Sequence, residues 1–279
     1  MFFKKIKFIL LVFLFYQSPL HSKSTFDDLN SKNLSKYFSG IVAFENKDNS
    51  TALNFFNSSK ILLNKHNPYL KRYIYTLVLE NKIPQAINIV KNNQNKSNTN
   101  FFDAHLLLIL DSLKKNDLDK AQEYLIISNK FDQKDRFTSA ILETLKQYIY
   151  VFKEKKILNE KKNFGKLSII SETFQKCFLG DKKTDVYFSN LANDISYDYT
   201  RYIYFYLSFL IDNNRIEEAK LISKDINYIN TTLLLSQAKN WIENEDFKKF
   251  SNFFSCKNYN DVISEFLFLV SNLYSSQDN

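Results

Sequence analysis

Four alanines recur along this chain at a spacing that predicts a series of helix pairs. Ala52, Ala86 and Ala121 follow one another at intervals of 34 and 35 residues, and Ala219 lies 98 residues further on, close to three more intervals. Each alanine stands just inside a segment that we expect to be the second helix of a pair. A fixed period of about 20–50 residues is typical of repeat proteins, in which every unit is one supersecondary element. The spacing therefore predicts stacked helical units.

The residues around these alanines repeat as well. An asparagine stands five residues before three of them, at Asn81, Asn116 and Asn214. Asparagine tolerates the left-handed backbone conformation at a helix end better than most residues other than glycine, so we expect the chain to reverse there. A small alanine where the two helices cross lets their backbones approach closely. Large apolar residues follow one helical turn after three of the alanines, at Phe56, Val90 and Leu125.

Composition points to the same class. The chain has three glycines and three prolines in 279 residues. Sandwiches, barrels and doubly wound sheets need many tight turns that depend on these two residues, so their scarcity favours an all-helical fold. An apolar fraction of 44% excludes wholesale disorder, and two cysteines exclude a disulfide-stapled scaffold.

Residues 1–24 resemble a cleaved export signal. Lysines at positions 4, 5 and 7 precede the apolar run 8–16, and Pro19 with small residues follows it. The run is too short to cross about 30 Å of hydrocarbon, which needs about 20 helical residues. We therefore expect export to the periplasm or cell envelope of a bacterium. The alternatives are an uncleaved membrane anchor, the one membrane contact that we expect, or a buried helix.

The net charge excludes one class of partner. The chain carries +8, and half of this excess comes from four lysines within residues 1–24. The remaining charge is weak and evenly spread, whereas nucleic-acid binding needs a concentrated basic patch. We expect no nucleic-acid partner.

The residues of the first unit resemble the tetratricopeptide repeat family. In YFSGIVAFENKDNSTALNFFNSSKILLNKHNP (37–68), Gly40, Ala52 and Phe56 occupy the small, small and aromatic positions of that family. Later units retain the alanine but depart elsewhere: Ile74 stands where glycine is usual, and the usual tryptophan of the first helix is missing throughout. The resemblance implies an all-α fold of antiparallel helix pairs stacked as a right-handed α-solenoid. It also implies a protein or peptide partner in the concave groove and no cofactor.

The resemblance places the first helix of each unit along that groove. Tyrosine and arginine are frequent binding hot spots. The alternative is that these side chains only pack between helices. The groove-facing positions, which are the predicted partner-binding residues, are Tyr37, Phe44, Lys71, Tyr75, Arg201 and Tyr204.

The middle and the end of the chain depart from the repeat. We place a soft boundary at the charged connector 159–163, which separates repeats in 25–158 from more degenerate ones in 159–279; the alternative is a solvated loop. Phe250 stands in an alanine position, and the next equivalent falls beyond the last residue. We expect a truncated array with an exposed apolar face on its last helix, or a last helix that is itself a cap.

Residues that carry chemistry are sparse. His66 and His105 have no partners at metal-ligand spacing, so we expect no metal site. We expect Cys177 and Cys256 to be two small buried side chains, with a disulfide as the alternative. Four carboxylates among lysines are expected to be solvated, at Glu172, Glu217, Glu218 and Glu265.

Two functions remain. The leading one is an exported, non-catalytic scaffold that holds a protein or peptide partner in its concave groove. The alternative is a superhelical accessory region of a cell-envelope enzyme, for example one acting on cell-wall glycan, whose catalytic domain is absent from this chain. Fold analogy alone supports either.

Overall fold

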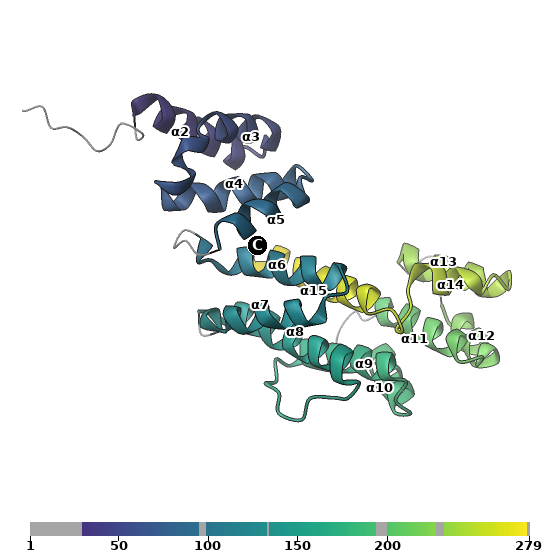
Figure 1. The fold of residues 1–279 in the computed structure, drawn as a ribbon. Helices are drawn as coiled ribbons and strands as arrows, with labels where there is room; N and C mark the ends of the chain where they lie inside the picture. Colours follow the sequence, from purple (N-terminus) through teal and green to yellow (C-terminus); the bar gives the residue numbers. More distant parts are fainter. Residues whose placement is uncertain (1–29, 95–98, 133, 194–199, 227–231, 278–279) are drawn as a thin grey trace, which may run out of the picture. The chain divides into compact units, whose positions relative to one another are not determined.

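The structure is a computed structural model. It describes residues 30–94, 99–132, 134–193, 200–226 and 232–277. Within these ranges the regular structure is helical, with fourteen α-helices and no strand (Figure 1). The all-helical class predicted from the scarcity of glycine and proline is confirmed. None of the described helices has both the length and the apolar character needed to cross a bilayer. The predicted export signal, residues 1–24, lies outside the described ranges.

The chain divides into two compact units, residues 1–104 and 105–279. Unit 1 holds two helical hairpins and the start of α6. Its helices are α2 (Ser31–Glu45), α3 (Asn49–Ser58), α4 (Asn67–Leu79) and α5 (Ile83–Asn92), with a 3-10 turn at Lys60–Asn64.

Unit 2 holds the remaining helices. They are α6 (Phe102–Lys114), which begins in unit 1, α7 (Leu118–Ser128), α8 (Arg136–Glu154), α9 (Lys166–Leu179), α10 (Thr184–Ala192), α11 (Thr200–Asp212), α12 (Ile216–Lys224), α13 (Leu233–Glu243), α14 (Lys248–Phe253) and α15 (Tyr259–Gln277). On either side of the connector 159–163 lie α8, which is 19 residues long, and α9, which ends at the left-handed Gly180.

Five hairpins share one turn geometry: α2–α3, α4–α5, α6–α7, α11–α12 and α13–α14. In each, one residue has a left-handed backbone, with φ between 56° and 62°. The N–H of the next residue donates to the carbonyl oxygen five positions back at 2.8–3.0 Å, which satisfies an orphan carbonyl of the helix end. The left-handed residues are Lys47, Asn81, Asn116, Asn214 and Glu245. The turns predicted at the three asparagines are therefore confirmed.

The residue five positions after each left-handed residue is completely buried. In four hairpins it is the alanine of the sequence repeat, and in α13–α14 it is Phe250. The ring of Phe250 stacks on Tyr204 at a centroid distance of 5.6 Å and meets the edge of Trp241 at 5.3 Å. The predicted equivalence of Phe250 with the alanines therefore holds in position, although the larger side chain fills its site by aromatic contacts.

A sixth hairpin, α9–α10, uses the same turn with glycine. Gly180 has φ 65°, and the N–H of Asp181 donates to the carbonyl oxygen of Lys176 at 3.0 Å. The position five residues on is the half-buried Asp185, whose carboxylate accepts hydrogen bonds from Tyr206 and Arg215. The alanine spacing did not reveal this unit because an aspartate stands where the alanine is expected.

α2 and α3 approach each other closely at Gly40. A Cβ atom built there would come within 2.8 Å of the ring of Phe56. Phe56 is completely buried and touches the rings of Tyr37 and Tyr69. The small residue at position 40 is thus required by the ring that α3 inserts against α2.

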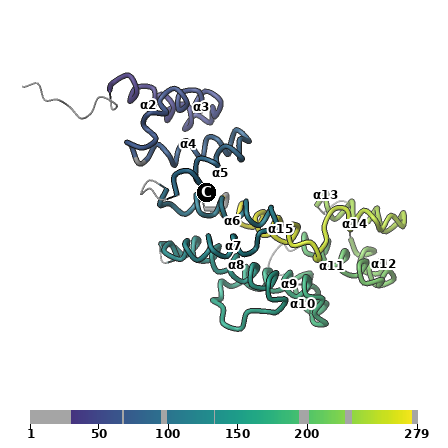
Figure 2. Tube along the Cα trace, viewed as in Figure 1, coloured from purple at the N-terminus to yellow at the C-terminus, as the bar shows by residue number. Residues whose placement is uncertain are grey.

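The last helix buries much of its apolar face. α15 packs against α8 and α9, and the trace in Figure 2 returns in yellow toward that part of the chain. Its apolar side chains Val262, Ile263, Phe266 and Val270 are buried. The expectation of an open face is therefore wrong for these four side chains, because α15 folds back within unit 2; Phe268, Leu273 and Tyr274 on the same helix are 42%, 40% and 44% exposed. Continuation of the array beyond this chain stays a prediction.

The charged connector 159–163 lies within unit 2, between α8 and α9. The Nζ of Lys161 pairs with Glu172 at 2.6 Å, and the backbone N–H of Lys162 donates to Glu143 at 3.2 Å. These contacts tie the connector to both helices. The soft boundary expected at this place stays a prediction.

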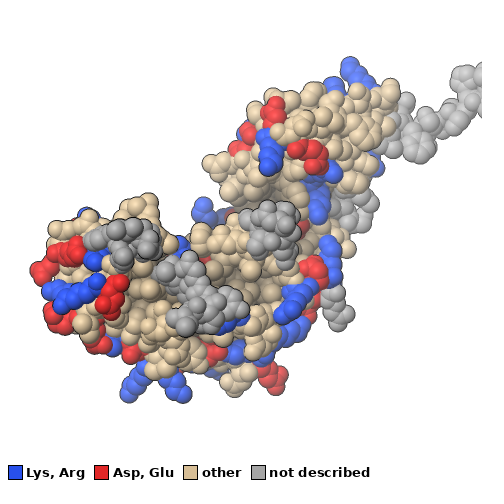
Figure 3. All heavy atoms as spheres, turned by 180° about the vertical axis from the view of Figure 1, so that it is seen from behind, with Lys and Arg blue, Asp and Glu red and all other residues tan. Residues whose placement is uncertain are grey.

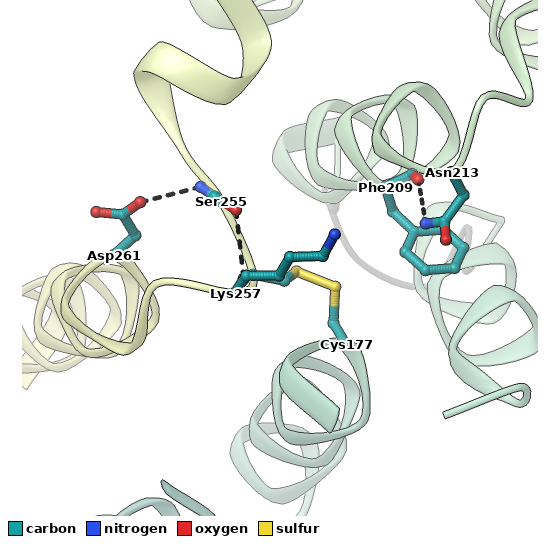
Figure 4. The surroundings of a disulfide bond; sticks show 7 residues. Cys177, Phe209, Asn213, Ser255, Lys257 and Asp261 are labelled. Carbon is teal, nitrogen blue, oxygen red and sulfur yellow. Dashed lines mark hydrogen bonds between the residues drawn. A yellow bond between two sulfur atoms is a disulfide. The ribbon is translucent and has the colours of Figure 1, made fainter. Parts of the chain in front are cut away.

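Cys177 and Cys256 form a disulfide (Figure 4). Both residues are buried, as expected, but the expectation that they remain unpaired is wrong. The bond joins the last turn of α9 to the segment before α15 across a separation of 79 residues, with the Cα atoms 5.6 Å apart. In Figure 4 the side chain of Lys257 extends past the sulfur atoms toward Asn213.

Candidate partner-binding surface

Polar side chains link the first helices of unit 1. Arg72 of α4 reaches back to α2, where its Nη1 lies 2.9 Å from Oε1 of Glu45. Tyr75, one turn further along α4, donates its hydroxyl to Oδ2 of Asp103 at the start of α6, at 2.7 Å. Because residues three and four apart share a helix face, the two contacts place the same side of α4 between its neighbours. We call Phe44, Lys71, Tyr75, Phe101 and Asp103 the unit 1 surface.

Lys71 carries the positive charge of this surface. Its Nζ lies 5.3 Å from the ring centre of Tyr75, 5.9 Å from that of Phe101 and 3.9 Å from Oδ2 of Asp103. The side chain is 44% exposed. Water therefore screens its attraction to Asp103, and the pairing is weak. An incoming carboxylate can take the place of Asp103 while the two rings still support the ammonium group.

Tyr37, predicted to face a partner, lies in the core of the first hairpin. It is 2% exposed and contacts the rings of Phe56, His66 and Tyr69. Burial raises the pKa of its hydroxyl, and the charge of the nearby Arg72 opposes that rise in part. Phe44, from the same helix, is half-buried and stays accessible. The accessible part of this predicted set is therefore Phe44, Lys71 and Tyr75.

The two predicted residues of unit 2 both lie on α11 but have different surroundings. Tyr204 is completely buried against Phe250, and burial raises the pKa of its hydroxyl. Arg201 instead forms a two-pronged ion pair with Glu265 of α15, at 2.8 and 2.5 Å. Tyr204 thus has no surface to offer a partner, and Arg201 already holds a carboxylate of its own chain.

The helical spacing of the sequence correctly predicted that Lys71 and Tyr75 lie close together, because they are one turn apart on α4. It missed Phe101 and Asp103, which complete the surface from the start of the next first helix. The signal that could have found Asp103 is an acidic residue in the first turn of α6, where it also complements the helix dipole. No alanine or asparagine marks these two positions.

The charges over the molecule are mixed in sign. On the face seen in Figure 3, Lys and Arg side chains lie among Asp and Glu side chains, without a continuous area of one sign. Among the residues that the structure describes, no cluster of three or more His, Cys, Asp or Glu has metal-binding geometry. Comparisons of this chain with protein-family models, with curated proteins and with solved structures find no match.

Proposed function

We propose that this protein is a non-catalytic scaffold that binds a protein or peptide partner. Its hairpins would stack as a right-handed α-solenoid of the tetratricopeptide type, with the first helices lining the concave side. The observation that carries the proposal is the shared turn: a left-handed residue, a hydrogen bond to the carbonyl five positions back and a completely buried residue five positions on recur in five hairpins. Repetition of one unit builds an extended surface suited to binding a chain.

The unit 1 surface supplies the chemistry for a peptide segment. A partner carboxylate would pair with Lys71, and a partner N–H would donate to Asp103. One apolar partner side chain would lie on Phe101 and a second one on Phe44, which are both half-buried. Tyrosine adds a hydroxyl and a flat ring at low cost in conformational entropy, which suits Tyr75 to such a surface. The proposed partner is therefore a segment that combines an acidic with an apolar side chain.

We further propose that the chain is exported to the periplasm or cell envelope. The charge and hydropathy pattern of residues 1–24 supports export. The disulfide between Cys177 and Cys256 supports it independently, since such bonds persist in oxidising compartments and are rare in reducing ones.

Affinity capture from the native source tests the proposal. Tagged wild type is compared with Lys71→Ala and Tyr75→Phe, and with Asn54→Ala on the exposed side of α3 as the matched control. Hot-spot losses of about 1–2 kcal/mol predict a roughly tenfold fall in recovery of the same partner for the two surface variants. Helical circular dichroism should be unchanged in all three. Equal recovery by every variant would remove these residues from the binding surface.

A further inference from the structure

The helix α15 belongs to none of the six hairpins described above. It lies against α6, α9 and α11, which open hairpins of unit 2, and against α8, which does not. It packs on α8 and α9. Its first residue, Tyr259, donates its hydroxyl to the carbonyl oxygen of Leu113 at the end of α6, at 3.3 Å. Near its middle, Glu265 pairs with Arg201 of α11. We call the surface formed by α6, α8, α9 and α11 the first-helix face of unit 2; α15 occupies it.

Aromatic pairs set the register of α15 on this face. Later residues of α15 contact earlier residues of α8, so the two 19-residue helices are antiparallel. The pairs are Tyr259 with Phe152 at 5.1 Å, Phe266 with Tyr148 at 5.7 Å and Tyr274 with Phe137 at 4.2 Å between ring centres.

The ion pair is the most specific contact of α15. Glu265 is 4% exposed, and burial raises the pKa of its carboxyl even though Arg201 opposes the rise. The guanidinium group also lies 4.0 Å from the ring centre of Phe268. Desolvation offsets much of the attraction within a buried ion pair, so such a pair fixes register and choice of partner more than stability.

Burial along α15 is graded. Val262 and Phe266, in the first half, are 0% and 1% exposed. Leu273 and Tyr274, in the second half, are 40% and 44% exposed. Segments with few buried apolar contacts open at lower free energy than the rest of a fold. The second half of α15 is therefore the place where a competing helix gains access.

We propose that the first-helix face of unit 2 is a helix-binding surface and that α15 is its displaceable intramolecular ligand. The external partner that it accepts is an amphipathic helix of another protein, with a carboxylate for Arg201 next to an aromatic side chain for Tyr148. This inference rests on the proposed scaffold function and specifies a second partner class for it. Grooves that take amphipathic helices read their anchors at helical spacing, which the α15 contacts reproduce.

The disulfide holds the start of α15 next to α9, so α15 competes with an external helix as a tethered ligand. Cys256 lies three residues before α15 and is bonded to Cys177 of α9. A displaced α15 therefore stays attached beside its own site. A tethered competitor acts at an effective concentration of about millimolar, so an external helix binds weakly until the contacts of α15 are weakened.

A synthetic peptide tests this directly. The probe is a fluorescein-labelled peptide of residues 257–277, titrated by anisotropy into full-length wild type and full-length Glu265→Gln. The variant should bind the probe about tenfold more tightly, because its own α15 no longer satisfies Arg201. A probe that itself carries Glu265→Gln should lose that advantage. Glu217→Gln, which alters an exposed carboxylate on α12, is the matched control and should behave as wild type.

Hydrogen exchange on the unmodified chain keeps the test independent of folding in the variants. The amides of α15 should exchange through an opening that leaves α11 and α13 protected. Exchange of α15 only together with α11 would make it an inseparable part of the core and would overturn the inference. So would equal probe binding by wild type and Glu265→Gln.

The experiments distinguish failure of the proposed function from failure of this inference. Lys71→Ala and Tyr75→Phe lie in unit 1 and should leave probe binding unchanged. A failed probe experiment alongside partner capture that depends on Lys71 and Tyr75 overturns the inference and leaves the proposed function standing.

Discussion

Asn81 and Ala86 stand in a fixed relation: Asn81 has a left-handed backbone with φ 56°, and Ala86, five residues on, is completely buried in the α4–α5 hairpin. The left-handed residue reverses the chain, and the hydrogen bond from Lys82 to the carbonyl oxygen of Leu77 closes the turn at 2.8 Å. The fifth residue then falls inside the hairpin, where it is completely buried. Recurrence of this relation makes the hairpins alike despite their divergent sequences.

Replacing Asn81 should change stability in a direction set by its backbone. Glycine carries no Cβ penalty in this conformation, so Asn81→Gly should raise the free energy of unfolding by up to about 1 kcal/mol. Valine is β-branched, so Asn81→Val should lower it by about 1–2 kcal/mol. Urea unfolding followed by circular dichroism measures both. The opposite order of the two variants would contradict the turn geometry.

The crossing at Gly40 predicts a coupled pair of substitutions. Gly40→Ala should lower the free energy of unfolding by about 1 kcal/mol, because overpacking against Phe56 exceeds the gain in helix propensity. In a Phe56→Leu background the ring is gone, and the same Gly40→Ala change should become neutral or stabilising. A double-mutant cycle with no coupling would show that the helices are not in contact at this point.

The disulfide should stabilise unit 2 mainly by restricting the unfolded chain. Closing a loop across 79 residues is worth about 4 kcal/mol in the chain-entropy model. Reduction of wild type should therefore shift the urea midpoint strongly downward. The double variant Cys177→Ala, Cys256→Ala should unfold near the reduced midpoint and ignore reductant. A reductant-insensitive wild type would contradict the bond.

Asp135 should make the stability of α8 depend on pH. Its carboxylate accepts from the backbone N–H of Thr138 at 2.7 Å, and this hydrogen bond lowers the pKa of the group below its ordinary value of 3.8. The stabilisation is therefore complete above that ordinary value and is lost as pH falls through the lower pKa of the folded state.

Asp135→Ala removes this cap and should cost about 1 kcal/mol at pH 7. The difference from wild type should shrink in acid. Asp135→Asn keeps an acceptor oxygen without a titrating charge, so it serves as the control whose stability should not carry this pH dependence. A deficit of Asp135→Ala that is the same at pH 7 and pH 2 would contradict the titration.

Local geometry was predictable wherever a residue type has a backbone preference. Asparagine marked three of the turns for this reason, whereas Lys47 and Glu245 have no such preference and their turns became visible only from φ. Alanine marked four completely buried positions of the hairpins by its size. The hairpin after Gly180 escaped because Asp185 fills the equivalent position with a polar contact to Arg215.

Long-range packing was not predictable in the same way. Glu265 was expected to be solvated, and that expectation is wrong because Arg201, 64 residues away, pairs with it in the interior. Tyr204 was expected on a binding surface, but the aromatic Phe250 in an alanine position covers it. Both errors arise because helical periodicity says which face a residue is on and not which helix returns to cover that face.

Photo-crosslinking from single positions tests the central claim, binding through the first helices, most directly. A photoreactive amino acid is placed at Phe44 or Lys71 on the first helices of unit 1, or at Asn54 or Gln85 on the exposed sides of the second helices, and the protein is irradiated in its native source. We predict one common adduct from Phe44 and Lys71 and none from the other two positions. The same adduct from all four positions, or from Asn54 and Gln85 alone, would contradict a partner held on the first helices.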